Sequence, residues 1–321
     1  MEKYCLDCPR IHKIAVIGCG FVGAACAFSL MQSGLFSEMV LIDKDHAKAE
    51  GEALDISHGI PFAKPINVFA GDYDDIKNAS VIIITAGANQ KPGETRLDLV
   101  QKNVAIFKEI LSEIRRRQYN GILLIVSNPV DILTTVALKL SGLPENKVLG
   151  TGTVLDTARL KHELGKHLNV DSRSIHAFII GEHGDSEIAA WSSANVSGIP
   201  LHYFCEMRGY FNHLADMQKI ALDVKNSAYE IISKKQATYF GIAMAVKRIC
   251  EAIIRDEKSI LSVSSMMHGE YGITDIALSM PAIVCRTGVE THVPIQLSAR
   301  EIKDLQKSAK TLKKVLFQNN V

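Results

Sequence analysis

The residue best suited to acid–base chemistry in this sequence is His183, which lies in the segment Gly181-Glu-His183-Gly184-Asp. An imidazole titrates near neutral pH, so it can donate and accept protons under ordinary conditions. The flanking glycines allow the backbone to come close to a ligand. We therefore expect His183 to be a catalytic acid or base. A loop histidine without a chemical role is the alternative, which these residues alone leave open.

A second candidate pair is formed by Asp156 and Arg159, which are three positions apart in a predicted helix over residues 153–168. Residues at this spacing share one helical face. An isolated pair of this kind is most often a surface ion pair that contributes little stability. The pair becomes a candidate for chemistry only if its face points at His183.

Two polar segments lie where strands are predicted to end. Residues 86–96 are rich in turn-forming and polar types, and the segment is long enough to be a mobile lid. Ser127-Asn128-Pro129 follows an apolar run. The carboxyl ends of strands in doubly wound sheets are where ligands bind. We expect both segments to contribute to a binding site.

Three glycines, Gly18, Gly20 and Gly23, form a GxGxxG pattern between an apolar run and a predicted helix. In this context Gly18 permits a tight turn, Gly20 lets a pyrophosphate approach the backbone, and Gly23 lets helix and strand pack closely. The amino end of the helix attracts the phosphates. The alternative is a strand–helix corner without a ligand.

Asp43 ends the second apolar run, 20 residues beyond Gly23. A carboxylate at this place accepts hydrogen bonds from both ribose hydroxyls and repels a 2′-phosphate. The sequence therefore favours NAD over NADP as the cofactor.

These residues are embedded in a regular alternation of strands and helices, which predicts an α/β fold with a doubly wound parallel sheet. The predicted strands are short apolar runs, as expected for strands covered on both faces, at 14–17, 39–42, 66–69, 81–84 and 122–126. The predicted helices between them cover 24–32, 45–56 and 94–118.

After about residue 150 the alternation loosens, and the pattern predicts an α+β second domain. We expect a helix at 153–168, a strand at 175–180, long helices at 214–233 and 237–255, shorter β runs such as 283–284, and a charged helix at 298–317. The predicted organisation is a tail over residues 1–10, a first domain over 11–150 and a second over 151–321.

Composition rules out a largely disordered protein and leaves two other classes without support. The chain has 321 residues, of which 47% are hydrophobic, and it carries a net charge of +1, so nothing supports a disordered chain, a nucleic-acid binder or a membrane-surface protein. Residues 14–31 carry no charge, but their three glycines favour a strand, a turn and a helix over a membrane span. We expect a cytoplasmic protein.

The seven cysteines indicate reduced thiols, because their number is odd and several lie in apolar runs. Cys5 and Cys8 form a CxxC, but no second pair of metal ligands is near in the sequence. We therefore interpret this segment as a loose N-terminal tail. We expect no metal site.

Taken together, five segments closely resemble the L-lactate dehydrogenases within the lactate/malate dehydrogenase family: GCGFVG, TAGANQKPGETR, VSNPVDI, LDTARL and IIGEHGDSE. The resemblance runs from about Lys13 to near the C-terminus. It implies an N-terminal NAD-binding Rossmann domain, a C-terminal α+β catalytic domain and a homotetramer. The implied reaction is reversible hydride transfer between NADH and pyruvate, giving L-lactate.

The resemblance also implies roles for individual residues. His183 matches the proton donor and acceptor, Asp156 its carboxylate partner, and Arg159 the arginine that holds the substrate carboxylate. Arg96 matches an arginine that polarises the carbonyl. The remaining substrate-binding matches are Gln90, which separates lactate from malate enzymes, Asn128 and Thr238. The expected NAD site comprises Gly18, Gly20, Val22, Gly23, Asp43, Lys48, Gly87, Ala88, Val126 and Asn128.

Two departures from the family pattern are visible. Many relatives have glycine where this chain has Gln236. Many bacterial members bind fructose 1,6-bisphosphate through an arginine and a histidine; His176 matches the histidine, but Lys161 stands at the arginine position, so allosteric activation stays open. The alternative functions are a malate or other 2-hydroxy-acid dehydrogenase and a non-catalytic NAD-binding scaffold.

Overall fold

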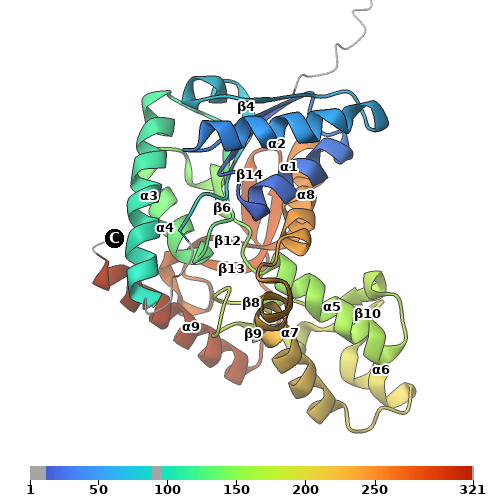
Figure 1. The fold of residues 1–321 in the computed structure, drawn as a ribbon. Coiled ribbons are helices and arrows are strands. Elements are labelled where there is room, and N and C mark those ends of the chain that lie inside the picture. Colours follow the sequence, from blue (N-terminus) through green and yellow to red (C-terminus); the bar gives the residue numbers. More distant parts are fainter. Residues whose placement is uncertain (1–11, 89–95, 320–321) are drawn as a thin grey trace, which may run out of the picture.

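The computed structural model describes residues 12–88 and 96–319 (Figure 1). Three residues singled out in the sequence, Cys5, Cys8 and Gln90, lie outside the described residues, and the description does not extend to the side chain of Arg96. Among the helices of the described ranges, none combines the length and the apolar character needed to cross a bilayer.

Six parallel strands form the first part of the central sheet, in the order β3-β2-β1-β4-β5-β6. All five predicted strands are present within a few residues of their expected bounds, whereas β6 was not predicted. The strands are β1 (Lys13–Ile17), β2 (Glu38–Ile42), β3 (Asn67–Ala70), β4 (Ala79–Ile84), β5 (Ile122–Ile125) and β6 (Val148–Gly150).

Successive strand residues point to opposite faces of this sheet, so both faces are apolar. Helices cover both faces and form two separate cores. Val81 and Ile83 of β4 lie in one core, and Ile82 and Ile84 lie in the other. One face packs against α1 (Phe21–Ser33), α2 (His46–His58) and α8 (Phe240–Ile254) (Figure 1). The other packs against α3 (Arg96–Arg116), α4 (Val130–Leu140) and α9 (Ala299–Gln318).

The sheet continues into the second half of the chain. β12 (Ser259–His268), β13 (Thr274–Cys285) and β14 (Gly288–His292) are antiparallel, and Ser264 of β12 pairs with Gly150 of β6 to make one nine-stranded sheet. The expectation of only short β runs near residue 283 was wrong. Strand β12 contains several serines and lacks a continuous apolar run, which hides a 10-residue strand from a search for such runs.

A second layer of structure lies beside the end of this sheet (Figure 1). Its core is built from apolar residues of α5, α7 and the short strands between them. Its elements are α5 (Val154–Leu168), β7 (Ile175–His176), β8 (Ile179–Ile180), β9 (Ile188–Ala189), β10 (Asn195–Val196), β11 (Ile199–Pro200), α6 (Leu201–Met207) and α7 (His213–Lys235). The predicted strand 175–180 is therefore two short strands separated by residues 177–178.

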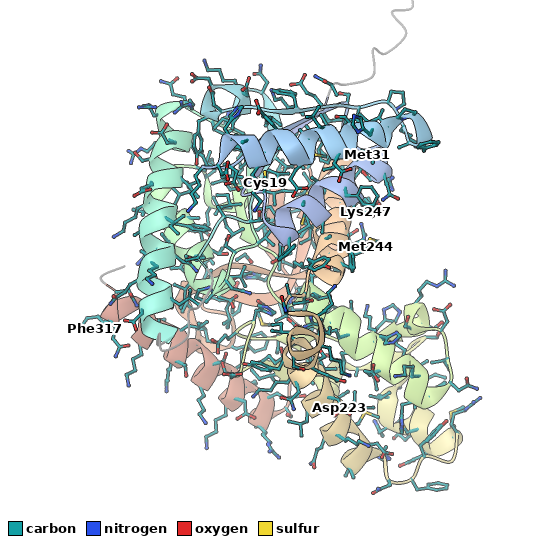
Figure 2. The ribbon with its side chains drawn as sticks, in the orientation of Figure 1. Cys19, Met31, Asp223, Met244, Lys247 and Phe317 are labelled. Atoms are coloured by element: carbon teal, nitrogen blue, oxygen red, sulfur yellow. The ribbon has the colours of Figure 1, made fainter. Side chains whose placement is uncertain are left out.

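Short 3₁₀ turns connect several elements, at Ile60–Phe62, Tyr73–Ile76, Glu145–Lys147, Ser172–Ser174, Trp191–Ser193 and Glu270–Gly272. Side chains fill the space between helices and sheet (Figure 2). Met31 of α1 is 2% exposed in this layer, whereas Met244 of α8 is 57% exposed. The face of α8 that points away from the sheet therefore presents apolar side chains.

Candidate active site

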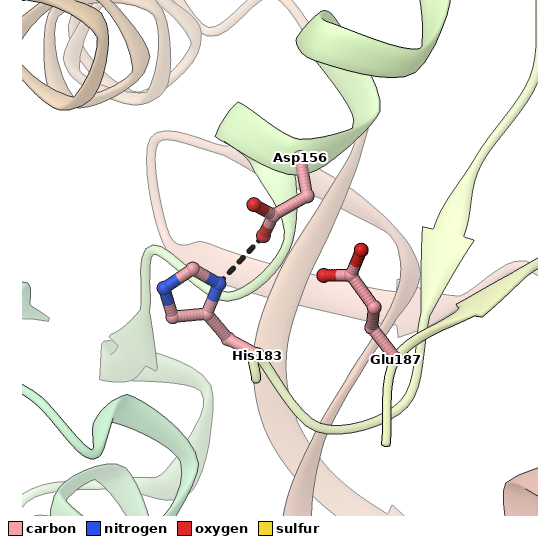
Figure 3. A group of neighbouring side chains, drawn as sticks. All are labelled: Asp156, His183 and Glu187. Carbon is pink, nitrogen blue, oxygen red and sulfur yellow. Dashed lines mark hydrogen bonds and ion pairs between the residues drawn. The ribbon is translucent and has the colours of Figure 1, made fainter. Parts of the chain in front are cut away.

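The structure brings His183 and Asp156 together. The turn after β8 carries His183, and its Nδ1 lies 2.6 Å from Oδ2 of Asp156, which belongs to the first turn of α5 (Figure 3). The Asp156 side chain is 3% exposed and that of His183 is 26% exposed. The carboxylate is thus buried behind an imidazole that stays accessible, which is the arrangement an acid–base catalyst needs.

Arg159 shares the same carboxylate. Its Nη1 donates to Oδ1 of Asp156 at 2.8 Å, so one oxygen of Asp156 contacts the guanidinium and the other contacts His183. The condition set by the sequence, that the face carrying Asp156 and Arg159 points at His183, is therefore met. The catalytic and substrate-binding roles of these residues stay predictions.

The electrostatics of the pair favour its charged form. Burial opposes the ionisation of Asp156, but His183 and Arg159 hold the pKa of this carboxyl below its usual value. Burial alone would lower the pKa of His183. The Asp156 carboxylate outweighs it and raises the pKa of His183 to about 9. A protonated His183 is the form that can donate a proton to a substrate oxygen.

A buried aspartate that the sequence reading did not single out holds the His183 turn. Asp131 of α4 accepts the backbone N–H of His183 at 2.8 Å. Its other oxygen accepts the hydroxyls of Ser264 at 2.6 Å and Ser279 at 3.0 Å. Asp131 lies in the VSNPVDI segment, three positions after Asn128. Its place just beyond the end of β5 was the signal that could have found it.

Glu187 is a further carboxyl of the site that the sequence reading missed. Ligand-type atoms of Asp156, His183 and Glu187 all lie within 4.8 Å of one another (Figure 3). This set could hold a divalent cation, but Asp156 and His183 already bond each other, so a cation would have to compete with that contact. The expectation of no metal site is not tested by this geometry.

The glycine-rich turn fits a bound pyrophosphate. Gly18 has a φ of +101°, and a Cβ there would lie 2.5 Å from the backbone nitrogen of Ala86. A Cβ on Gly23 would lie 1.9 Å from the Gly18 oxygen, whereas one on Gly20 would meet no atom of the described residues within 4 Å. Two glycines are therefore required for packing, and the third leaves open space beside the amino end of α1, where a phosphate would bind.

Asp43 lies at the end of β2, beside this turn. Its Oδ2 accepts the backbone N–H of Cys19 at 2.7 Å, and its Oδ1 accepts that of Asp45 at 3.0 Å. These bonds fix the carboxylate beside the glycine-rich turn, and its contact with a ribose stays a prediction. Of the other residues predicted here, Val22 is half-buried and Lys48 is exposed on α2.

The remaining predicted NAD residues are connected through a buried side chain. Asn103 of α3 is 2% exposed; its Oδ1 accepts the backbone N–H of Ala88 at 2.7 Å, and its Nδ2 donates to the carbonyl of Asn128 at 2.8 Å. Asn103 thereby ties the segment after β4 to the segment after β5. Gly87 and Asn128 are exposed, whereas Val126 is buried, with 7% exposure.

The other predicted residues lie at the edges of this region. Thr238 is half-buried in the link between α7 and α8, and Gln236 ends α7 with a φ of 69°. Lys161 lies on α5, where burial lowers its pKa, and His176 is exposed on β7. Arg96 begins α3, directly after the undescribed segment that contains Gln90.

Comparison with known proteins agrees with this geometry. Residues 12–150 match the model of the lactate/malate dehydrogenase NAD binding domain, and residues 153–320 match that of the lactate/malate dehydrogenase alpha/beta C-terminal domain. The chain is 52% identical over 306 residues to the L-lactate dehydrogenase of Acetivibrio thermocellus, which covers 95% of this chain and 96% of that one. It is also 52% identical over 304 residues to L-lactate dehydrogenase 1 of Clostridium acetobutylicum, covering 95% and 97% of the two chains.

Solved structures give the same result. A lactate dehydrogenase from a Medee basin deep-sea metagenome library matches with a TM-score of 0.94 and 44% identity, covering 97% of this chain and 100% of that one. The ligand-bound minor L-lactate dehydrogenase from Enterococcus mundtii matches with a TM-score of 0.92 and 43% identity, covering 96% and 98%. The resemblance seen in the sequence is confirmed, and the chain belongs to the lactate/malate dehydrogenase family.

Proposed function

We propose that this protein is an NAD-dependent L-lactate dehydrogenase that interconverts pyruvate and L-lactate. The observation that carries the proposal is the 2.6 Å contact between His183 Nδ1 and Asp156 Oδ2, with Arg159 on the second oxygen of the same carboxylate. This arrangement supports His183 as the proton donor and Arg159 as the cation that binds the substrate carboxylate. Both are needed to bind and reduce a 2-oxo acid.

Each residue has a chemical task in this reaction. Bound NADH supplies the hydride, which is delivered to C2 of pyruvate. Negative charge then develops on the C2 oxygen, and His183 donates its proton there. Asp156 orients the imidazole and favours its charged form. In the reverse direction the neutral imidazole accepts the proton of the lactate hydroxyl.

The two arginines bind charge. Arg159 holds the substrate carboxylate, because a guanidinium has five N–H donors and the bond to Asp156 uses only one nitrogen. Arg96 stabilises the charge on the C2 oxygen, an effect that is large in a site that excludes water. The family resemblance assigns Gln90 and Thr238 to substrate binding, and Asn128 to a contact with substrate and nicotinamide.

The cofactor is NAD. The open space at Gly20 and the fixed carboxylate of Asp43 support pyrophosphate and ribose binding, with Lys48, Gly87, Ala88 and Val126 lining the rest of the site. Asp43 would repel the 2′-phosphate of NADP. Residues 11–150 carry the cofactor site, and residues 151–321 supply the catalytic groups.

A direct experiment tests the function. NADH oxidation is followed by absorbance with pyruvate, oxaloacetate and 2-oxoisocaproate in parallel, and NADPH replaces NADH in a second series. We expect the highest kcat/KM for pyruvate with NADH. A higher value for oxaloacetate would make the protein a malate dehydrogenase, and a higher value for 2-oxoisocaproate a dehydrogenase of bulkier acids. Turnover of none of the three would favour a non-catalytic NAD-binding scaffold.

The protein assembles into a homotetramer in the cytoplasm. Large apolar side chains gather on the outer faces of α1, α2 and α8, namely Phe21, Phe28, Leu54, Phe240 and Met244, each more than half exposed. Exposed apolar groups of this density are typical of subunit interfaces. Light scattering on the purified protein tests the assembly, and a Met244→Glu variant should shift it toward smaller species.

A further inference from the structure

The catalytic centre contains one carboxyl group that the proposed reaction does not yet use, that of Glu187. Ligand-type atoms of Glu187, Asp156 and His183 all lie within 4.8 Å of one another. In Figure 3 the Glu187 carboxyl points toward the His183–Asp156 pair from the side of Asp156. Glu187 is therefore close enough for its charge to affect both partners.

The Glu187 carboxyl is not needed to hold its own loop in place. The backbone N–H of Glu182 donates to Ser308 Oγ at 3.0 Å, and the hydroxyl of Ser186 lies 2.8 Å from the same Oγ. Asp131 holds the turn at His183. By contrast, Oε1 of Glu187 is buried and has no hydrogen-bond partner in the part of the chain that the structure describes.

A buried polar atom without a partner costs stability, so such atoms in native proteins call for an explanation other than folding. A glutamine or an apolar residue at this position would avoid the free-energy cost of burying a charge. The adjacent pair offers an explanation, because the charge of Glu187 acts on both His183 and Asp156.

The groups that face Glu187 come from three elements. Burial and the Asp156 carboxylate raise the pKa of Glu187 to about 8, while His183, Arg159 of α5 and Lys225 of α7 oppose the rise. The pKa of His183 is about 9, and both Asp131 of α4 and Glu187 contribute to its elevation after Asp156. The two groups titrate over overlapping ranges, so the charge of each changes the proton affinity of the other.

We propose that Glu187 is a positioning residue for proton transfer: its ionised carboxylate stabilises the imidazolium of His183 through the Asp156–His183 pair and so extends pyruvate reduction to more alkaline pH. Its catalytic meaning depends on the proposed function. The proton that Glu187 loses goes to solvent, and the proton of His183 still goes to the C2 oxygen of pyruvate, so the balance of the reaction is unaltered.

The test compares Glu187→Gln with Glu182→Gln, a matched change five residues earlier in the same loop. The Glu182 carboxylate bonds Ser186 and not the catalytic pair. We expect the alkaline limb of kcat/KM for pyruvate to move down by about one pH unit in Glu187→Gln, because a charge within about 4–6 Å shifts a pKa by at least this much. At the wild-type midpoint pH the protonated fraction falls from about one half to about one eleventh, which is about a 5-fold loss. The acid limb for lactate should move in the same direction, and Glu182→Gln should shift neither.

A second readout is independent of turnover. The imidazole titration of His183, followed by NMR in histidine-labelled protein and assigned with His183→Asn, should move down in Glu187→Gln. If the variant does not fold, the isosteric pair Glu187→Asp and Glu187→Asn makes the same comparison of charge. An unmoved profile together with an unmoved imidazole titration overturns the proposal. A wild-type protein without pyruvate turnover instead defeats the proposed function, while the NMR titration still decides the role of Glu187.

Discussion

The backbone N–H of His183 donates a 2.8 Å hydrogen bond to the buried carboxylate of Asp131, which lies 52 positions earlier in the chain. Helix α4 therefore holds the turn that carries His183. The second oxygen of Asp131 binds Ser264 on β12 and Ser279 on β13. One carboxylate thus joins helix α4, the antiparallel strands β12 and β13, and the turn that carries His183. The position of His183 therefore depends on contacts between α4, in the first half of the chain, and β12 and β13, in the second half.

The first prediction concerns Asp131→Asn. The amide presents an N–H₂ donor to groups that now donate to the carboxylate, so at least one buried donor loses its acceptor, at a cost of about 1–3 kcal/mol. We expect a lower urea midpoint and a fall in kcat/KM for pyruvate, because the His183 backbone is no longer held. Ser279→Ala, which removes one donor only, should have a smaller effect. Equal stability of Asp131→Asn and wild type would show that the carboxylate is not the anchor.

The second prediction is that His183→Asn retains NADH binding but loses turnover by about 10²–10⁴-fold, the usual contribution of general acid–base catalysis. NADH binding should persist because the glycine turn between β1 and α1, and Asp43 after β2, belong to other segments of the chain than the loop that carries His183. Fluorescence titration with NADH and steady-state kinetics with pyruvate measure the two effects separately. Turnover within a few-fold of wild type would remove His183 from the mechanism.

These strands were predictable from the sequence because β1, β2, β4 and β5 contain short continuous apolar runs, which are typical of parallel strands buried on both faces. Helix α4 was not predicted. Its residues 130–137 are all buried, Asp131, Thr134 and Thr135 included, so its polar positions do not mark a face exposed to solvent. A similar limit applies to functional residues, because the sequence does not show which side chains folding brings together. Motifs pointed to His183 and Asp156. Asp131 and Glu187 lie in two of the same segments, but their contacts with His183 and Asp156 become visible only in the fold.

The third prediction is weak or absent activation by fructose 1,6-bisphosphate. Lys161 is a point charge that lacks the planar two-pronged contact of an arginine with phosphate. Burial also lowers the pKa of Lys161, so keeping this side chain charged is costly. His176 could supply one contact. The measurement is a pyruvate saturation curve with and without the sugar bisphosphate, in wild type and in Lys161→Arg. We expect a larger response in the variant; a large drop in apparent KM for the wild type would show that lysine suffices.

The fourth prediction concerns Gln236, which has a φ of 69° where α7 ends. This left-handed conformation favours glycine, the residue that many relatives have at this position. Gln236→Gly should therefore stabilise the protein by up to about 1 kcal/mol, since relief of the left-handed strain exceeds the entropy that glycine adds to the unfolded chain. Gln218→Gly, in the exposed interior of the same helix, should destabilise it by about 0.5 kcal/mol. Thermal unfolding of both variants measures the opposite signs, and destabilisation by both would contradict the account.

The last prediction concerns substrate specificity at Gln90, six positions before Arg96. We expect this residue to face the end of the substrate away from the carboxylate that Arg159 holds. Pyruvate presents a methyl group there, which a neutral glutamine meets without introducing charge. Oxaloacetate presents a second carboxylate, and burying it against glutamine leaves the charge without a cation, which is costly in a site that excludes water.

Gln90→Arg should reverse this preference, because arginine pairs with the additional carboxylate and is left unpaired over a methyl group. An unpaired buried charge costs several kcal/mol, so the combined change should reach roughly 10³-fold or more in relative kcat/KM. Gln90→Met, which is neutral and similar in size, should keep the preference for pyruvate and so isolates the effect of charge. The measurement is kcat/KM for both acids in the three proteins. A change of only a few-fold in Gln90→Arg would mean that Gln90 is a solvated loop residue, and that specificity is determined elsewhere in the pocket.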